Sequence, residues 1–427
     1  MPTIEAFAEI EMLEDVVSSC ALGNSRFAIG TIDGKLQIFE IDNLLQDADF
    51  DSAIISIIKS DEEVITASTT GLIKSMNESP SWQHEIQSGI EHMISLGKMI
   101  CISDTSGSII FLNSKGNKER TQSHGDVNRL AHSVDGGYLA IAKTDGTLLL
   151  SSKSGEILQE SFADPEDVET ISQICFRSDG ILLACRDSLG MTLDERPENR
   201  LECWHPQRGL LHTTELPAMA TSILATEDGA IVGCQNGAIL RFRIGKEVEE
   251  LLIVDNSVSS IIQWEQDLII GTWFNAKRIS SSGDIIWSYE HEGLVTEILE
   301  IGSDLITVIG RSPTSQKPAS IVLLEPNSEP TIPEDESYVY EFSKDATNEF
   351  AGGLSDEEIA IAEAPPIPSN ETNELLDALD EELDHIEDEK VISEADILAD
   401  LSASAKAINL PPIADAGEDK TIPSEDY

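Results

Sequence analysis

A short phrase recurs along the first three quarters of the chain: an apolar run, a polar turn that contains glycine, and a second apolar run. Clear copies are "FAIGTIDGKLQIFEI", "VITASTTGLIKSMN" and "MICISDTSGSIIFLN". The turn glycines Gly34, Gly71, Gly107 and Gly146 follow one another at spacings of 37, 36 and 39 residues, and Gly237 marks a further copy. Flanks of this kind around a glycine that can adopt positive φ predict a β-hairpin in each copy.

Three degenerate copies bring the series to eight. They are "ILLACRDSLGMTLDERPENRLECWHP", "LIIGTWFNAKRISSS" and "LITVIGRSPTSQKPASIVLLEP". Each copy has a preceding apolar strand such as "AIISIIKS", and most have a following one such as "DIIWSYEHE". Four strands in roughly 40 residues, repeated radially, predict four-stranded antiparallel blades. The sequence therefore predicts an all-β fold, an eight-bladed β-propeller over residues 1–330.

The eighth copy has no fourth strand after "SIVLLEP". The N-terminal segment "TIEAFAEIEM" alternates apolar and polar residues as an outer strand does. Because an unclosed ring leaves an exposed sheet edge, we expect the N-terminal strand to complete the last blade.

Two of the repeats resemble known propeller families. "HSVDGGYLAIAKTDGTLLL" and "FRSDGILLACRDSLG" are similar to the inner strands of WD-repeat blades, although they lack the Trp-Asp and Gly-His signatures. "SSSGDIIWSYEHEG" resembles the quinoprotein-type repeat, whose tryptophan docks one blade on the next; here it is Trp287. The resemblance implies the architecture and no particular function, since such folds host many.

The charge of the chain limits its partners. The 79 acidic residues outnumber the 27 lysines and arginines, for a formal net charge of -52. Such a surface repels phosphate backbones and anionic lipids, so we expect neither nucleic-acid binding nor membrane insertion. A generally acidic or salt-adapted proteome explains the charge equally well.

The cysteines and the N-terminus favour a cytoplasmic location. The six cysteines are scattered, and most lie within apolar runs, which predicts free buried thiols, with disulfides or a metal site as the alternatives. The first residues lack the basic start and apolar core of a secretory signal.

Composition changes near residue 331. From there to residue 427 the chain has 28 acidic residues and four lysines, which predicts a disordered acidic tail. Two short helices are expected within it, near 372–389 and 393–407. The first would place Leu376, Leu379, Leu383 and Ile386 along one face, as a recognition helix, an undocked nascent helix or part of a short coiled coil. The final residues, "PPIADAGEDKTIPSEDY", resemble the first strand of a polycystic-kidney-disease-type domain, which implies an extracellular setting.

Motifs for chemistry are incomplete. No phosphate-binding loop and no HExxH zinc motif occurs in the sequence. Asp47, Asp49 and Asp51 have calcium-loop spacing, but Ser52 and Ile58 stand where that loop needs Gly and Glu, so a solvated loop is the interpretation. We therefore predict no catalytic residue, no cofactor and no metal.

Departures from the repeat indicate where function resides. The turn between the second and third strands is long in the fifth and eighth copies and carries "WFNAKR" in the seventh. Loop variation on a rigid scaffold is typical of binding sites. The candidate partner-binding face consists of Arg196, Arg200, Trp273, Phe274, Lys277, Arg278, Arg311 and Lys317. The acidic tail is expected to dock weakly on these bases.

The sequence thus predicts a monomeric, non-enzymatic scaffold that binds protein partners. One alternative is an enzyme or small-ligand binder, for a sugar or a quinone, that uses the central funnel. The other is a cell-surface adhesion module.

Overall fold

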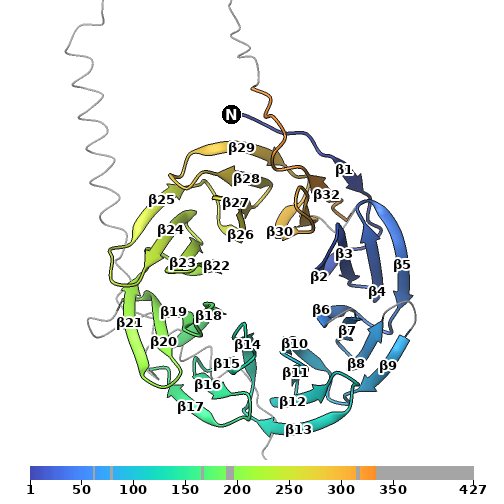
Figure 1. Ribbon diagram of the computed structural model, residues 1–427, viewed down its shortest axis with the longest axis vertical. Coiled ribbons are helices and arrows are strands. Elements are labelled where there is room, and N and C mark those ends of the chain that lie inside the picture. Colours follow the sequence, from blue (N-terminus) through green and yellow to red (C-terminus); the bar gives the residue numbers. More distant parts are fainter. Residues whose placement is uncertain (61–62, 77–79, 165–167, 189–196, 314–317, 333–427) are drawn as a thin grey trace, which may run out of the picture. The chain divides into compact units, whose positions relative to one another are not determined.

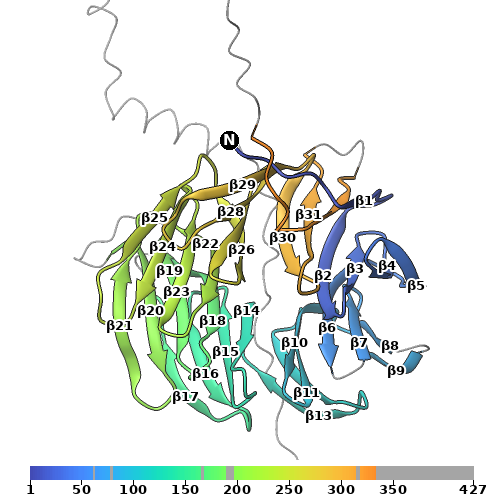
Figure 2. The ribbon, with the colours of Figure 1, turned by 45° about the horizontal axis from the view of Figure 1, so that its top comes forward.

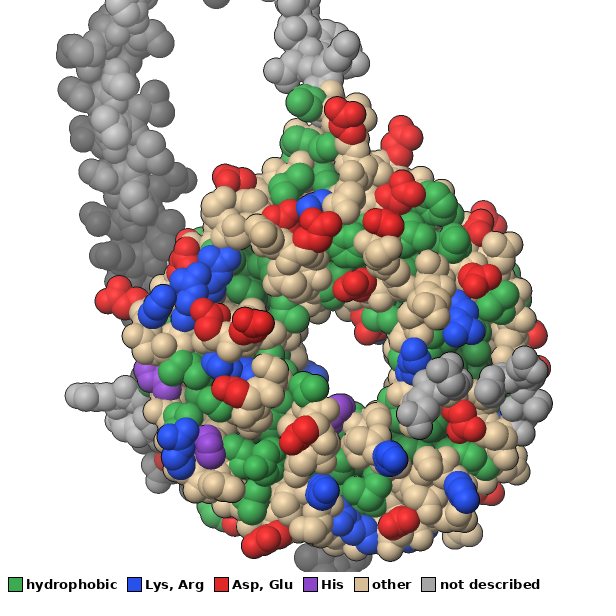
Figure 3. All heavy atoms as spheres, viewed as in Figure 1, with side chains coloured by type: hydrophobic (Ala, Val, Ile, Leu, Met, Phe, Trp, Pro, Cys, Tyr) green, Lys and Arg blue, Asp and Glu red, His purple; other side chains and the backbone are tan. Residues whose placement is uncertain are grey.

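The computed structural model describes residues 1–60, 63–76, 80–164, 168–188, 197–313 and 318–332. Their strands form eight four-stranded antiparallel sheets arranged in a ring (Figure 1). The space-filling view shows an open channel through its centre (Figure 3). The predicted eight-bladed β-propeller is confirmed. The tail helices and the C-terminal segment lie outside the described residues.

The first four blades each use four consecutive strands, from the channel outward. Blade 1 is β2 (Val16–Gly23), β3 (Arg26–Thr31), β4 (Lys35–Glu40) and β5 (Asn43–Asp49). Blade 2 is β6 (Ile54–Ser60), β7 (Glu63–Ser68), β8 (Leu72–Met76) and β9 (Pro80–Glu85). Blade 3 is β10 (Ile90–Leu96), β11 (Met99–Asp104), β12 (Ser108–Asn113) and β13 (Lys118–Ser123). Blade 4 is β14 (Val127–His132), β15 (Tyr138–Lys143), β16 (Leu148–Ser152) and β17 (Ile157–Ser161).

The next three blades repeat this order, and the last one differs. Blade 5 is β18 (Glu169–Phe176), β19 (Leu182–Ser188), β20 (Asn199–His205) and β21 (Gly209–Glu215). Blade 6 is β22 (Ala220–Ala225), β23 (Gly229–Cys234), β24 (Ala238–Arg243) and β25 (Glu249–Ile253). Blade 7 is β26 (Val258–Trp264), β27 (Asp267–Thr272), β28 (Asn275–Ile279) and β29 (Ile285–Glu290). Blade 8 is β30 (Leu294–Glu300), β31 (Ile306–Arg311), β32 (Ile321–Leu324) and β1 (Ala8–Ile10).

The N-terminal segment closes the ring, as predicted. β1 pairs antiparallel with β32, with Glu9 opposite Val322. Residues before β1 continue along the rim, where the amide of Ser288 on β29 donates to the carbonyl of Pro2 at 2.9 Å. Ile4 is buried beside Trp287 in the core between blades 7 and 8. The segment therefore completes blade 8 and also contacts blade 7.

The second strands are buried on both sides because each lies between two neighbouring blades. Small residues recur near their ends, where the next blade approaches closely. A Cβ added at Gly30 would come within 2.5 Å of Ile54 on the following blade, and one at Gly271 within 2.8 Å of Val295. The glycines thus set the spacing between blades, and stacked blades form the core.

The turn glycines adopt the conformation that the repeat predicts. Gly34, Gly71, Gly146 and Gly237 have φ of 92°, 108°, 76° and 85°. The Asp47–Asp51 segment differs from the expectation of a solvated loop. Its first part, through Asp49, lies on the outer strand β5, because these residues pair in register with β4 and their side chains alternate in exposure.

Candidate protein-interaction face

The ring has two faces that differ in their connections. Because strands alternate in direction, the eight blade-to-blade linkers and the turns between second and third strands lie on one face, called the linker face here. The turns between first and second and between third and fourth strands lie on the opposite face, the turn face (Figure 2). Both loop classes that the sequence analysis singled out therefore share the linker face.

Charge is segregated between these faces. Among the described residues, the linkers and turns of the linker face contain no lysine or arginine. Their acidic residues are Glu11, Glu14, Asp15, Asp33, Asp51, Asp126, Asp145, Asp164, Glu198, Asp255 and Glu292. The described turns of the turn face mix both signs, and their bases are Lys98, Lys115, Lys153, Arg177, Arg208 and Lys246. Figure 3 views the ring from the turn face, where blue and red side chains are interspersed.

Three bases stand at strand ends next to the linker face. Lys143 pairs with Asp145 at 3.0 Å, so its charge is offset. Lys35 begins β4 and Arg311 ends β31. Arg311 is exposed and has no ion-pair partner among the described residues.

The structure brings only part of the predicted basic face together. Trp273 lies on the linker face, 53% exposed, and Phe274 beside it is half-buried. The carbonyl of Trp273 accepts a hydrogen bond from the amide of Val295. Val295 pairs with the residue of β31 that precedes Arg311. Trp273, Phe274 and Arg311 are thus grouped around blades 7 and 8.

Two other predicted bases are not free to bind a partner. Arg278 forms an ion pair with Asp267 at 2.7 Å and donates to the Pro326 carbonyl at 2.8 Å, near the turn-face end of β28. Arg200 is 6% exposed and is described below. Lys277 is half-buried in the middle of β28, whereas Arg196 and Lys317 lie outside the described residues.

Arg200 belongs to a buried ionic network between blades 4 and 5. Its Nε lies 2.9 Å from Glu202, its Nη2 pairs with Glu169 at 2.5 Å, and its Nη1 donates to the Pro197 carbonyl at 3.4 Å. Arg186 bridges the same two carboxylates and donates to the Gly146 carbonyl at 2.6 Å. Burial lowers the pKa of Arg200, but the two carboxylates outweigh this and raise it. The network joins two blades, so the expectation that Arg200 contacts a partner is corrected.

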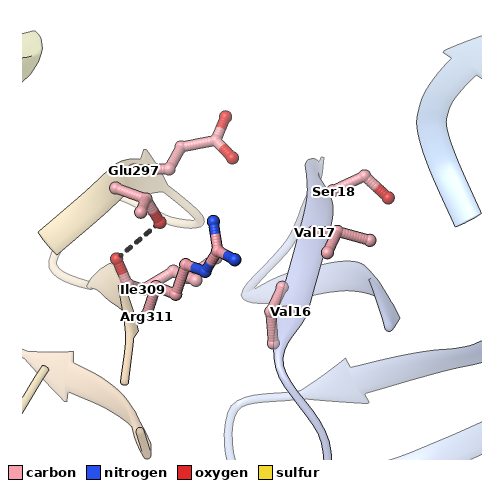
Figure 4. A pocket seen from close by; sticks show the side chains of 7 residues that line it. Val16, Val17, Ser18, Glu297, Ile309 and Arg311 are labelled. Carbon is pink, nitrogen blue, oxygen red and sulfur yellow. Dashed lines mark hydrogen bonds between the residues drawn. The ribbon is translucent and has the colours of Figure 1, made fainter. Parts of the chain in front are cut away.

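A pocket opens at the seam where blade 8 meets blade 1. Its volume is about 450 Å³, and Val16, Val17 and Ser18 of β2 face Glu297, Ile309 and Arg311 across it (Figure 4). The apolar residues come from both blades, and the charged ones come from blade 8. We call this hollow the seam pocket.

At the seam pocket the bulge residue of β30 makes no hydrogen bond to a described residue of the next blade, and the Ser19 hydroxyl of β2 donates to Glu297 instead. Every inner strand has a β-bulge close to its linker-face end, and bulge residues of other blades bond to the next blade. Ser259 donates to the Val295 carbonyl at 2.6 Å, and Thr221 to the Val258 carbonyl at 2.7 Å. At the seam, Thr296 instead donates within its own blade, to Ile309 at 3.2 Å. β30 and β2 accordingly lie further apart than other neighbouring inner strands.

Glu297 gives the seam pocket an acidic group that titrates at higher pH than usual. Burial raises the pKa of its carboxyl, although a hydrogen bond from the Ser19 hydroxyl acts in the opposite direction. The pocket therefore combines an apolar wall, a carboxyl group with a raised pKa and an exposed guanidinium. Such a mixture suits binding of a side chain or a small molecule.

Exposed apolar side chains also gather on the linker face. Leu13, Ile32, Phe162 and Val168 are 82%, 49%, 69% and 62% exposed in its linkers and turns. None of these four residues was among the predicted binding residues. The available signal was an aromatic or aliphatic residue inside a polar linker, as in "SFADPED".

The described residues contain neither a cluster of metal-ligating side chains nor a helix that could span a membrane. No group of three or more potential ligand side chains is placed there to hold a metal ion. No helix in that part has the length and apolarity needed to cross a bilayer. All six cysteines are free thiols, and burial raises the pKa of Cys175 and Cys234 to about 12.

Comparison with known proteins identifies the architecture. No family model matches the chain, and no curated protein matches its sequence. Many solved structures do match in three dimensions. BamB from Moraxella catarrhalis aligns with a TM-score of 0.57 and 14% identity, over 76% of this chain and 99% of that one. The fold is that of WD40-type and BamB-type β-propellers.

Other matches have the same character. Sqt1 from Saccharomyces cerevisiae gives a TM-score of 0.63 at 11% identity, over 76% of this chain and 99% of that one. The C-terminal WD40 domain of Sif2 gives 0.59 at 13% identity, over 75% and 98%. A structure of Chaetomium thermophilum Sqt1 contains the N-terminus of ribosomal protein L10 and gives 0.61 at 12% identity, over 75% and 99%. At these identities the similarity concerns the fold alone.

Proposed function

We propose that the chain is a non-enzymatic protein-interaction scaffold that binds a polypeptide through its linker face. One observation carries the proposal: this face groups an exposed tryptophan, an unpaired arginine and an open, partly apolar pocket around blades 7, 8 and 1. Tryptophan and arginine dominate binding energy at protein interfaces, especially beside a pocket that a partner can fill. The fold match to a propeller bound to a protein N-terminus supports this mode of binding.

The same proposal places the protein in a reducing compartment such as the cytoplasm. Six free thiols, most of them in the cores between blades, are compatible with that setting. Partner binding there needs neither nucleic acid nor membrane insertion.

The test compares variants of the two faces in affinity purification followed by mass spectrometry. The linker-face variant combines Trp273→Ala with Arg311→Ala. The matched control combines Val134→Ala, a 75% exposed residue of a turn-face turn, with Lys98→Ala. We expect one set of proteins to be retained by wild type and control and lost from the linker-face variant.

A purified candidate must then reproduce the difference. Loss of two interface anchors should weaken binding by about 2 kcal/mol or more, which is roughly 30-fold in Kd. Equal binding by wild type and both variants would contradict use of the linker face.

A further inference from the structure

The seam pocket lies at a junction whose two inner strands are bridged differently from those of other blades. Ser18 of blade 1 donates to the Ile54 carbonyl of blade 2 at 2.6 Å, and Asn128 of blade 4 donates to the Ile171 carbonyl of blade 5 at 2.9 Å. Between blades 8 and 1 the bridge joins two side chains, because the Ser19 hydroxyl donates to Glu297. Such a bridge spans more space than one to a backbone carbonyl, so room for a ligand remains at the seam.

Arg311 supplies this pocket with a positive charge that forms no ion pair among the described residues. Its side chain is exposed, and Figure 4 shows the guanidinium projecting from β31 into the pocket. Glu297 lines the same pocket, but burial raises the pKa of its carboxyl, which favours the uncharged form. The pocket therefore favours a ligand that brings a negative charge to Arg311.

The walls beside Arg311 are apolar and come from both blades. Val16 and Val17 belong to β2 and Ile309 belongs to β31, and Val17 is 44% exposed. The volume of about 450 Å³ falls within the range of about 300–1,000 Å³ that is typical of small-ligand pockets. A ligand that fits has its negative charge close to a compact apolar group.

The acidic loops around the pocket disfavour ligands with many negative charges. Glu14 and Asp15 directly precede β2, and Glu292 lies in the linker before β30. Nucleic acid, polyphosphate or a run of acidic residues would place several negative charges beside these loops, and like charges repel. A single carboxylate on an otherwise uncharged segment requires only Arg311 as its partner.

The C-terminus of a polypeptide combines these features. Its carboxylate is attached to the Cα that also carries the last side chain, so a charged and an apolar group enter one pocket together. A glutamate side chain has its carboxylate at the end of an unbranched stem and offers no apolar branch beside it. The last amide N–H of a polypeptide also needs an acceptor, and the Glu297 carboxyl lines the pocket. Capture of a C-terminal carboxylate is a recurring mode of peptide recognition.

We propose that the seam pocket captures the C-terminus of a partner polypeptide, with the terminal carboxylate on Arg311 and a branched aliphatic terminal side chain against the apolar walls of β2 and β31. The inference rests on the proposed function and names the part of the partner that enters the linker face. Residues before the terminus lie across blade 8 toward Trp273, whose carbonyl is bonded to the amide of Val295 on β30.

The experiment measures binding of three small probes to the full chain by ligand-observed saturation-transfer NMR. N-acetyl-valine carries the terminal carboxylate, the branched side chain and the amide N–H, whereas N-acetyl-valine amide lacks the negative charge. N-acetyl-glutamate α-amide has its only charge on the side chain and represents an internal acidic residue. Arg311→Gln removes the charge of the pocket, Arg311→Lys keeps it, and the matched control Arg208→Gln removes an exposed arginine from the turn face.

We expect N-acetyl-valine to bind wild type and the Arg208→Gln control alike, with a Kd on the order of 1 mM. Arg311→Gln should bind it at least about tenfold more weakly, because a charged hydrogen-bond partner is lost, and Arg311→Lys should lie between the two. The amide probe and the glutamate probe should each bind wild type at least about tenfold more weakly than N-acetyl-valine does.

Three results would overturn the inference. They are equal binding of N-acetyl-valine by wild type and Arg311→Gln, equal or tighter binding of either other probe, and no binding of N-acetyl-valine below about 20 mM. Each leaves the proposed function intact if Trp273→Ala alone abolishes retention of partner proteins, because the linker face then binds them without the seam pocket.

Discussion

Closure of the ring by the N-terminal segment, residues 1–10, called the clasp here, can be tested by truncating one buried side chain, that of Ile4. Ile4 is 6% exposed and packs in the core that contains Trp264 and Trp287, yet it belongs to a segment far from them in sequence. Replacing a buried isoleucine with alanine costs about 2–5 kcal/mol, because it removes apolar contact and leaves a cavity. The segment lies at the rim and can shift into the space, so we expect Ile4→Ala to cost about 2–3 kcal/mol.

The cost has an upper limit set by the clasp itself. The clasp has a three-residue strand pairing and backbone bonds between Thr3 and Thr331 at 2.9 and 2.8 Å. If Ile4→Ala lowered the free energy of unfolding by more than all of these contacts contribute, the segment would detach from the ring. The destabilisation would then equal the total contribution of the segment and could not increase further. Deleting residues 1–10 should therefore destabilise the protein more than Ile4→Ala does.

Urea unfolding monitored by tryptophan fluorescence provides the assay, since Trp287 is fully buried beside the clasp. The matched control is Ile32→Ala, the same substitution at a 49% exposed position, with an expected change below about 0.5 kcal/mol. If Ile4→Ala and Ile32→Ala have the same midpoint, the N-terminal segment does not close the ring.

The remaining predictions concern turns and buried charges, and each is checked by the same unfolding assay. Gly34→Val should cost at least about 1 kcal/mol more than Gly245→Val, because both glycines have positive φ but only Gly34 has backbone atoms within 2.8 Å of an added Cβ. Arg200→Ala should cost about 3–5 kcal/mol, since Glu169 and Glu202 would lose a buried partner. Burial raises the pKa of Asp187, so its folded pKa exceeds the unfolded one and stability is lost as pH rises. Asp187→Asn removes this loss, and its advantage over wild type should grow as the pH rises from about 4 to neutrality.

The sequence was sufficient for the architecture because the repeat is local. Each hairpin depends on a glycine and its flanks, so the turns at Gly34 and Gly237 could be predicted one at a time, and their positive φ is confirmed. Closure by the N-terminal strand followed from counting strands and is also confirmed. The tail helix with Leu376 and Ile386 stays a prediction.

The composition of the site could not be predicted in the same way. Arg200 stands two residues past a long turn, but Glu169 lies 31 residues earlier and becomes its partner only when the blade forms. Arg278 lies four residues past its turn, and a rise of about 3.3 Å per residue carries it toward the other face. The seam pocket depends on the spacing between β30 and β2, which no local pattern determines. Tertiary pairing, rather than loop composition, thus decides which bases are available.

The segregation of charge between the faces bears on why the chain is acidic. An acidic proteome would add carboxylates and remove bases over the whole surface, and it would leave the two faces alike. Instead, the described turns of the turn face retain six lysines and arginines, while the linkers and turns of the linker face have none. Near that face on blade 5, Arg186 and Arg200 are buried and paired with carboxylates, whereas Arg311 at the end of β31 is exposed. The loops of the linker face are therefore acidic, and the bases that offset part of this charge, Lys35, Lys143 and Arg311, stand at the adjoining strand ends rather than in the loops.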